Sequence, residues 1–196
     1  MKKRKGILFI ISAPSGSGKT TLCTRLVESV DSLYRSISMT TRAPRPGEKD
    51  GMDYIFIEKP EFIKRLKKNE FLEWAKVFGE YYGTPKKHIT HMLKRGSDVL
   101  LSIDVQGAMK IKRLKLDAVY IFILPPSIAM LKERLINRST DSKEAIRGRL
   151  HIAKKEIASS QKYDYVIVNN RLEPALDNLR AIIIAERCKV KRSLAA

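Results

Sequence analysis

A glycine-rich run near the amino terminus carries the residue types best suited to binding phosphate. The run is Ala13-Pro14-Ser15-Gly16-Ser17-Gly18-Lys19-Thr20, and Thr21 follows it. Gly16 and Gly18 allow backbone conformations that aim successive N–H groups at phosphate oxygens, and a helix beginning near Lys19 adds the positive end of its dipole. The run matches the P-loop pattern, except that Ala13 stands where the first glycine is usually written. It therefore predicts a site for the phosphates of ATP.

Lys19 and Thr20 have the chemistry that phosphoryl transfer requires of such a loop. A lysine at this position can reach the transferred phosphate, and the hydroxyl of Thr20 can bind Mg²⁺. The alternative is a chance glycine and serine turn between a strand and a helix. We favour the phosphate site, because a buried-strand pattern precedes the run and a helix pattern follows it, which is the context that the motif requires.

An acid at the end of another strand usually completes the metal side of a P-loop site. Asp104 directly follows the apolar residues 99–103 and is the candidate. Aspartate is also a preferred helix cap, and a helix pattern begins near Gln106. The sequence leaves both interpretations of Asp104 open.

A second candidate for phosphate binding lies in residues 38–48, where Arg42 and Arg45 stand among prolines. A guanidinium fork held by a proline-stiffened backbone makes paired, charge-assisted hydrogen bonds to a phosphate oxyanion. A loop that binds nucleic acid would have a similar composition. Residues 71–75 and 79–84 add aromatic side chains with an embedded acid, a pattern that is more often core than ligand site.

The elements that must position these residues alternate between strands and helices. Short apolar runs predict buried strands at 7–11, 99–103, 119–124 and 165–168. Helical patterns lie at 20–30, 106–114, 127–137, 143–159 and 173–191. Such alternation predicts an α/β fold in which helices cover a parallel sheet.

Residues 36–84 have a different texture, which predicts an inserted, partly antiparallel lobe. Short β-like pieces at 36–41 and 54–57 accompany a helix at 60–69. The polar, arginine-rich residues 137–149 have little apolar content and predict a mobile flap. At 196 residues with 43% apolar content, the chain is expected to form one domain, with its core at 1–35, 85–136 and 150–196.

The charge of the chain favours anionic partners. Its 39 lysines and arginines exceed its 21 aspartates and glutamates, which gives a net charge of +18. Nucleotides, nucleic acids and anionic membranes all fit this charge. Much of it can equally form a solvated surface, so the charge sets the sign of the partner and not its identity.

Cysteine and histidine usage points to a reducing environment. Two cysteines without Cys-x-x-Cys spacing and three histidines without suitable neighbours predict neither a disulfide framework nor a zinc site. The basic residues 2–5 and apolar residues 6–13 superficially resemble a secretory signal, but the apolar part is short and runs into the glycine-rich loop. We therefore expect a cytoplasmic protein without a membrane span.

Several further motifs, taken in order, resemble those of guanylate kinases. They are Ser-x-Thr-Thr-Arg-x-Pro-Arg-x-Gly-Glu at 38–48, Gly-x-Asp-Tyr at 51–54, Glu-Trp at 73–74, Tyr-Tyr-Gly-Thr at 81–84, Ile-Asp-x-Gln-Gly at 103–107, Pro-Pro-Ser at 125–127, the arginines of 134–150, and Val-Ile-Val-Asn at 166–169. The likeness covers nearly the whole chain, and the combination is far more specific than any single motif.

The resemblance implies a P-loop, three-layer core with a parallel sheet, an inserted mixed α/β lobe for GMP at 36–84, and a small helical lid at 137–149. ATP and GMP would be the substrates and Mg²⁺ the cofactor, with no obligatory nucleic acid or membrane partner, in a monomer or homo-oligomer. Ser38, Glu73, Thr84 and Asp104 would face guanine, and Arg42, Arg45, Tyr54 and Tyr82 would hold the acceptor phosphate. Asn169 would lie near the ATP base, and Lys19, Arg134, Arg138 and Arg149 would bring positive charge to the phosphates.

This assignment agrees with the chemistry of guanine. The Watson–Crick edge of guanine presents a ring N–H beside an amine, and one carboxylate, that of Glu73, can accept from both. Adenine would leave that carboxylate buried and unpaired.

A few positions depart from the pattern of the family. Ser102 stands where an acid usually lies two residues before Asp104, which bears on the handling of Mg²⁺. Ser139 and Asp141 replace the usual glycine and glutamate of the lid, and Asn170 replaces an aspartate. These last three bear only on the lid and the base pocket.

Three other functions compete with phosphorylation of GMP. A scaffold domain with the same fold would bind phosphorylated peptides without catalysis, but such domains typically lose the ATP cradle that this chain keeps. An RNA-binding protein would fit the charge and would bind in a strongly salt-dependent way, yet it leaves the motifs of 38–84 unexplained. A P-loop kinase for another phosphorylated small molecule is disfavoured by Glu73 together with Ser38.

Overall fold

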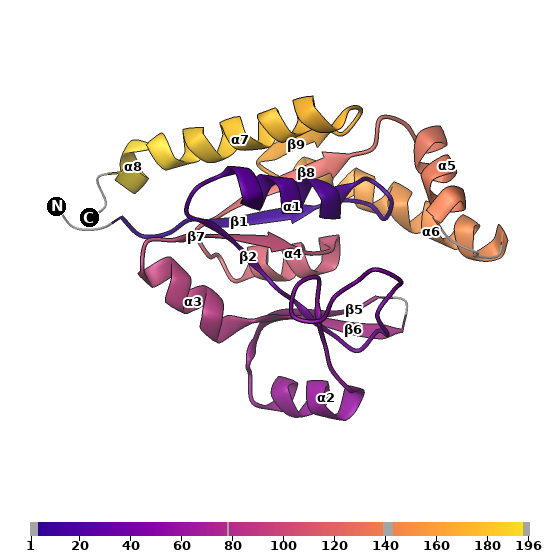
Figure 1. The fold of residues 1–196 in the computed structure, drawn as a ribbon, viewed down its shortest axis with the longest axis horizontal. Helices are drawn as coiled ribbons and strands as arrows, with labels where there is room; N and C mark the ends of the chain where they lie inside the picture. Colours follow the sequence, from indigo (N-terminus) through magenta and orange to yellow (C-terminus); the bar gives the residue numbers. More distant parts are fainter. Residues whose placement is uncertain (1–3, 78, 139–142, 194–196) are drawn as a thin grey trace.

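The computed structural model describes residues 4–77, 79–138 and 143–193. Its centre is a five-stranded parallel sheet with the strand order β2-β7-β1-β8-β9 (Figure 1). The strands are β1 (Leu8–Ser12), β2 (Leu33–Ser36), β7 (Asp98–Ser102), β8 (Ala118–Leu124) and β9 (Tyr165–Val168). The four strands expected from apolar runs are all present, and the predicted α/β class with a parallel sheet is confirmed.

Helices cover both faces of this sheet and divide the core into two clusters. Alternate residues of β1 point to opposite faces, because side chains alternate along a strand. Phe9 and Ile11 pack with α1 (Lys19–Ser29) and α7 (Leu172–Cys188). Leu8 and Ile10 pack on the other face, where α3 (Lys86–Lys94) and α4 (Val105–Arg113) lie. The result is the three-layer core that the sequence predicted.

A second, four-stranded sheet forms a lobe beside the core (Figure 1). Its order is β4-β3-β6-β5, with β3 (Met39–Thr40), β4 (Ile55–Phe56), β5 (Phe71–Val77) and β6 (Glu80–Pro85). Strands β5 and β6 pair antiparallel and β3 pairs parallel with β4, so the lobe is mixed, as expected. Helix α2 (Lys59–Lys67) packs on the lobe through Phe62, whose ring stacks on Phe71 at 4.5 Å.

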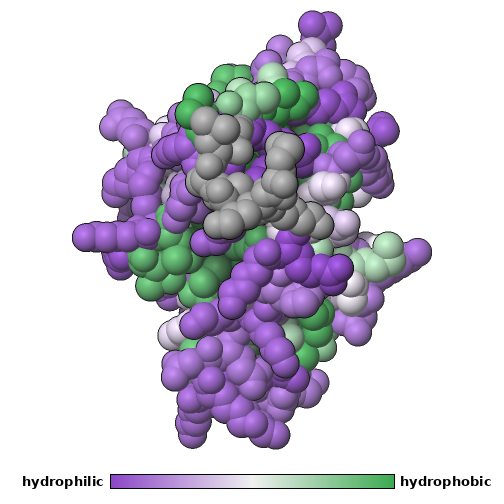
Figure 2. Space-filling model, turned by 90° about the vertical axis from the view of Figure 1, so that its left-hand side faces the viewer, coloured by the Kyte–Doolittle hydropathy of each residue, from purple (hydrophilic) through white to green (hydrophobic). Residues whose placement is uncertain are grey.

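The end of the molecule that carries α2 is mostly hydrophilic on the face shown in Figure 2. Only Phe62 of this helix is buried. An amphipathic helix of this kind is held to the lobe by one apolar stripe, while its charged residues face solvent.

The remaining helices follow β8 in the chain. They are α5 (Ile128–Arg138), α6 (Lys143–Ala158), the 3₁₀ turn η1 (Ser159–Lys162) and α8 (Val190–Ser193). Leu131 and Leu135 of α5 pack with Ala153 of α6 in a small cluster of their own. Of the expected lid at 137–149, residues 143–149 form the beginning of α6, and residues 139–142, which include Ser139 and Asp141, lie outside the described residues.

Some elements differ from the sequence-based expectation. The single β-like piece expected at 36–41 is split, because Ser36 ends β2 in the core sheet whereas Met39–Thr40 belongs to the lobe. The strands β5 and β6 and the helix α3 were not predicted. The long helix expected at 173–191 is interrupted at Lys189, where the backbone leaves the helical region.

Within the described part of the chain, no helix is both long and apolar enough to cross a membrane.

Candidate functional site

A cavity of about 360 Å³ lies where the P-loop, the lobe and α6 meet. The loop between β1 and α1 forms one wall, and side chains of β5, β6 and the segment 38–54 form another. The ends of parallel strands form such crevices, because the loops that follow the strands diverge there. The position fits a site that binds two ligands, one on the core and one on the lobe.

The P-loop adopts the backbone that its glycines were expected to allow. Gly16 has φ of 88° and Gly18 has φ of 82°, a left-handed region that side-chain-bearing residues avoid. Gly18 directly precedes α1, so the N-terminus of that helix faces the cavity. This arrangement offers backbone N–H groups and a positive dipole to an anion.

Lys19 occupies a defined position on the cavity wall. Its Nζ donates a hydrogen bond of 2.9 Å to the carbonyl oxygen of Ile103 at the end of β7. Burial lowers the pKa of Lys19, whereas the nearby Asp104 raises it. Lys19 has lost much of its hydration, so an anionic ligand, such as the phosphate chain of ATP, would stabilise its positive charge.

Asn169 braces the P-loop from behind. Its Nδ2 donates a hydrogen bond of 2.8 Å to the carbonyl oxygen of Ser17. The same nitrogen lies 2.5 Å from the place where a Cβ on Gly18 would stand. The buried Asn169 thus fixes the loop, and its contact with the ATP base stays a prediction.

Glu73 is the buried acid of the lobe. It is 7% exposed, and its Oε1 accepts a hydrogen bond of 2.5 Å from the hydroxyl of Thr84 on the paired strand. Burial raises the pKa of Glu73 to about 7, while the bond from Thr84 lowers it and the charge of Asp104 raises it. Ionisation of a carboxyl group buried in this way costs free energy, unless a ligand supplies hydrogen-bond donors to the carboxylate.

Gly107 in α4 makes the position of Glu73 possible. A Cβ on Gly107 would lie 2.6 Å from Oε2 of Glu73 and 3.0 Å from its Cδ. Lys110, one turn further along α4, donates to the carbonyl oxygen of Trp74 and lies over the Trp74 ring at 4.4 Å. Helix α4 therefore fixes the part of β5 that carries Glu73.

Arg42 forms the centre of a polar group on the lobe. Its Nη2 pairs with the carboxylate of Glu48 at 2.9 Å, and its Nε donates to the hydroxyl of Tyr82 at 3.2 Å. The guanidinium also lies 5.4 Å from the centre of the Tyr54 ring. A charge held from several sides in this way is preorganised for an anion.

Asp104 has the capping role that the sequence left open. Its Oδ1 accepts a hydrogen bond of 3.0 Å from the backbone N–H of Gly107 at the start of α4. The side chain also lines the cavity, as do Thr20 and Ser102. These hydroxyl and carboxylate oxygens are the donors that Mg²⁺ prefers, so the residues fit a Mg²⁺ ion bound together with phosphates.

Helix α6 contributes residues that sequence reasoning missed. Arg149, Ile152 and Glu156 line the cavity from this helix, and only Arg149 was expected. Burial raises the pKa of Glu156 to about 7; the charge of Asp104 adds to the rise and that of Lys19 opposes it. Nothing in the local sequence marks Glu156, because its helix has charged residues on several sides.

Most of the expected site residues come together at this cavity. Those that line it are Ala13, Pro14, Ser15, Gly16, Ser17, Gly18, Lys19, Thr20, Ser38, Arg42, Arg45, Tyr54, Glu73, Tyr82, Asp104 and Arg149. Thr84 and Asn169 lie behind the wall and hold residues that line it. Thr21 and Arg134 are not among the lining residues, and the side chain of Arg138 lies outside the described residues.

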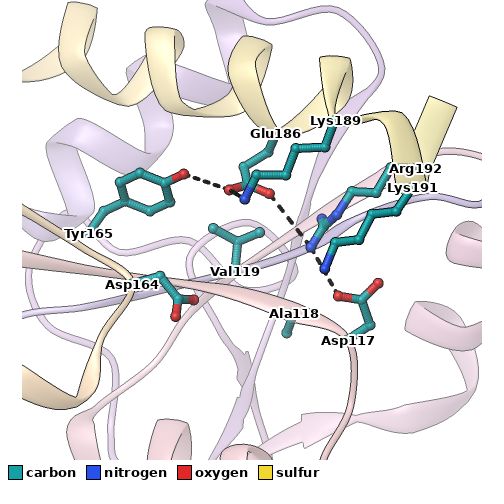
Figure 3. A pocket seen from close by; sticks show the side chains of 9 residues that line it. All are labelled: Asp117, Ala118, Val119, Asp164, Tyr165, Glu186, Lys189, Lys191 and Arg192. Atoms are coloured by element: carbon teal, nitrogen blue, oxygen red, sulfur yellow. Dashed lines mark hydrogen bonds and ion pairs between the residues drawn. The ribbon is translucent and has the colours of Figure 1, made fainter.

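A second hollow, of about 390 Å³, lies near the carboxyl terminus (Figure 3). Its acids are already paired: Glu186 accepts from Tyr165 at 2.6 Å and binds Lys189, and Asp117 binds Arg192 at 3.0 Å. Arg192 also lies 3.6 Å from Glu186, so it ties α8 to α7 and to Asp117 just before β8 (Figure 3). The hollow therefore has a structural explanation, and the residues expected to bind phosphate line the first cavity.

Comparison with known proteins agrees with the geometry. The family model described as Guanylate kinase matches residues 5–186. Guanylate kinase of Clostridium perfringens (strain 13 / Type A) is 48% identical over 191 residues, which is 97% of this chain and 88% of that protein. Guanylate kinase of Rickettsia bellii (strain RML369-C) is 48% identical over 189 residues, 96% of this chain and 99% of that protein.

A solved structure has the same overall fold. The crystal structure of guanylate kinase from Anaplasma phagocytophilum superposes with a TM-score of 0.83 at 37% identity. The match covers 98% of this chain and 92% of that chain, so it includes the core and the lobe together.

Proposed function

This chain belongs to the guanylate kinase family, and we propose that its cavity transfers the γ-phosphoryl group of ATP directly to GMP in a Mg²⁺-dependent, in-line reaction. At the coarser level, its relatives identify it as an ATP:GMP phosphotransferase. The observation that carries the finer proposal is the buried Glu73 on the lobe facing the same cavity as the P-loop.

Guanine is proposed to bind through Glu73. The carboxylate accepts from the ring N–H and the amine of guanine, with Thr84 holding one oxygen and Ser38 lining the same wall. Adenine carries an acceptor where guanine has the ring N–H, so it would leave this buried acid without donors. The 2′-hydroxyl of the sugar has no part in this contact, and dGMP is proposed as a second acceptor.

The acceptor phosphate is proposed to bind at Arg42. Tyr82 and Tyr54 lie against this guanidinium, and Arg45 lines the same wall of the cavity. Glu48 holds the guanidinium in place from the side. Paired N–H groups of arginine suit a phosphate dianion better than a point charge does.

The donor phosphates are proposed to bind at the P-loop, on the opposite wall. Lys19 would leave the carbonyl of Ile103 for the phosphate chain, and Arg149 adds charge from α6. Arg134 and Arg138 are proposed to add further charge when the lobes close. Positioning and charge neutralisation are nearly all that a protein contributes to this reaction.

Thr20 and Asp104 are the residues proposed to hold Mg²⁺, the first directly and the second through water. When bound, the ion would neutralise charge on the transferred phosphate. ATP and GMP are thus the proposed partners, with no obligatory nucleic acid or membrane, and the free cysteines Cys23 and Cys188 accord with the cytoplasm as the proposed location.

The test is a coupled assay of ADP release with a panel of acceptors. We expect turnover with GMP and dGMP and little with AMP, CMP or UMP, and loss of turnover when Mg²⁺ is removed by a chelator and its return when Mg²⁺ is restored. Equal turnover of AMP and GMP would refute the proposed role of Glu73.

A further inference from the structure

One arginine of the cavity wall has no part in the roles assigned above. Arg35 lies on β2, the edge strand of the core sheet, where it pairs with Leu100 of β7. Its half-buried side chain lines the cavity that also contains Lys19 and Tyr54. It therefore stands on the core side of the boundary between core and lobe.

The guanidinium of Arg35 has little to bind within the protein. Its Nη2 makes one long hydrogen bond, of 3.5 Å, to the carbonyl oxygen of Asp53, and its buried Nε has no hydrogen-bond partner. Among the side chains that the structure describes, those of residues 4–77, 79–136 and 146–192, no carboxylate oxygen lies within 4.0 Å of a nitrogen of Arg35. Arg42, by contrast, has Glu48.

The positive charge of Arg35 affects the pKa of residues on both walls of the cavity. Burial is the main cause that lowers the pKa of Lys19, and the positive charge of Arg35 lowers it further. Burial raises the pKa of Tyr54, and the same charge of Arg35 opposes that rise. Arg35 thus lines the cavity and acts electrostatically on one residue of each wall, Lys19 on the wall proposed for the ATP phosphates and Tyr54 on the wall proposed for the GMP phosphate.

Position 102, on the face of the sheet that Arg35 occupies, carries serine and not an acid. Ser102 lies two residues after Leu100, the partner of Arg35, and therefore on the same face of the sheet. Burial raises the pKa of the Cys23 thiol, and the Ser102 hydroxyl and the positive charge of Arg35 both oppose that rise. The serine at position 102 carries no charge, so Arg35 gains no ion pair from it.

We propose that Arg35 is a further phosphate-binding residue, which contacts the phosphate chain where the acceptor phosphate of GMP meets the γ-phosphate of ATP. A half-buried guanidinium without an acid loses hydration and is compensated only when an anion arrives. This inference rests on the proposed function, because that function supplies the two phosphates.

The test is calorimetric binding with three probes. Guanosine has no phosphate, tripolyphosphate has no base, and an adenosine–guanosine pentaphosphate analogue spans both sites. The variants are Arg35→Met, which removes the guanidinium, and Arg35→Lys, which keeps the charge and guards against misfolding. Arg95→Met is the matched control, because it removes the same charge from an exposed position at the end of α3, outside the cavity.

We expect Arg35→Met to weaken binding of the pentaphosphate analogue by about 10- to 100-fold, the usual effect of losing charge-assisted hydrogen bonds. Tripolyphosphate should lose affinity as well, and guanosine should not. Arg35→Lys should lose less than Arg35→Met, and Arg95→Met should bind all three probes as the wild type does. Unchanged affinity of Arg35→Met for the analogue, or an equal loss for guanosine, would overturn the proposal.

The probes also separate this inference from the proposed function. If the wild-type protein failed to bind guanosine but Arg35→Met still lost affinity for tripolyphosphate, guanine recognition would be wrong and the role of Arg35 would stand. If guanosine bound well and neither Arg35 variant lost affinity for either phosphate probe, the function would stand and the role of Arg35 would be wrong.

Discussion

The Oγ1 of Thr84 donates a hydrogen bond of 2.5 Å to Oε1 of Glu73 across the β5–β6 pair. Both residues are buried, and they are register partners in the antiparallel sheet. The bond fixes one oxygen of the carboxylate and leaves the other toward Gly107. An acid fixed in this way is preorganised for a ligand with two adjacent donors.

The first prediction concerns pH. Because burial raises the pKa of Glu73 to about 7, the free protein carries a protonated acid below that pH, and guanine needs the ionised form. Guanosine affinity should therefore fall by about tenfold for each pH unit below about 7. Titration with guanosine, followed by calorimetry, avoids the titration of the phosphate of GMP.

Two variants serve as controls for this pH dependence. Glu73→Gln should show no slope, and Glu156→Gln should keep the slope, although the pKa of Glu156 is also raised to about 7. If the slope disappeared in Glu156→Gln and persisted in Glu73→Gln, the group that titrates would be Glu156 and not Glu73.

The same titration of Glu73 should affect the stability of the protein, in the direction opposite to its effect on guanosine binding. The folded pKa of Glu73 lies above its ordinary value of 4.5, so the folded state retains a proton that the unfolded state has lost between about pH 4.5 and 7. The free energy of unfolding should fall as pH rises through that range, by at most about 3 kcal/mol. Urea unfolding of wild type and Glu73→Gln above pH 7 would reveal this as extra stability of the variant.

Gly107→Ala should move Glu73 and weaken GMP binding. The new Cβ would stand 2.6 Å from Oε2 of Glu73, so the carboxylate must shift. We expect the KM for GMP to rise by about 10- to 100-fold, as on loss of charge-assisted hydrogen bonds, with the KM for ATP nearly unchanged. Gly148→Ala is the matched control, because a Cβ there meets nothing within 4 Å; an equal effect of both variants would dismiss the contact.

Lys19→Ala should separate chemistry from acceptor binding. Its Nζ lies at the end of β7, on the P-loop wall, whereas Glu73 lies on the lobe. Loss of one preorganised electrostatic contact typically lowers the rate by about 10²- to 10³-fold. GMP affinity measured by calorimetry should stay near that of the wild type, and wild-type turnover in the variant would contradict the assignment of the P-loop.

Asp98→Asn should destabilise the fold at the end of the sheet away from the cavity. The side chain of Asp98 is fully buried and binds Arg4 at 2.8 Å and Arg187 at 2.7 Å. Burial raises the pKa of Asp98, but the bonds from Arg4, Ile7 and Arg187 outweigh burial and hold it below its ordinary value. The stabilisation is thus present above pH 3.8 and is lost as pH falls through the lower folded pKa.

We expect Asp98→Asn to lower the free energy of unfolding by about 3 kcal/mol, because it removes the charge from a buried ion pair whose arginines keep some solvent. Asp177→Asn, which affects an exposed pair with Arg180, should cost less than about 1 kcal/mol. Urea unfolding at neutral pH compares the two, and similar costs would show that burial of Asp98 is unimportant.

Sequence patterns predicted the parts of the fold that local chemistry determines. The apolar run at 7–11 is buried on both faces of the sheet, and the glycines of the P-loop have the expected positive φ. Asp104 shows what local sequence could not predict, because its side chain both caps α4 and lines the cavity. Local residues could not decide between these two roles.

The features that were missed depend on residues distant in sequence. Strands β5 and β6 are half-buried and pair with each other, and their aromatic residues alone suggested only a core. Arg35 and Glu156 reach the cavity from an edge strand and a late helix, and no motif marks either residue. The need for glycine at position 107 arises only from the approach of Glu73.

The most direct test of guanine recognition by Glu73 is to measure the initial rate of Glu73→Gln over a grid of ATP and GMP concentrations. An amide keeps the size of the side chain but points a donor at the donors of guanine. The loss of such hydrogen bonds can weaken recognition of the base by about 10²- to 10⁴-fold. We expect the KM for GMP to rise within that range and the KM for ATP to remain that of the wild type. A rise in the KM for ATP with the KM for GMP unchanged would show that the two walls of the cavity have been assigned the wrong way round.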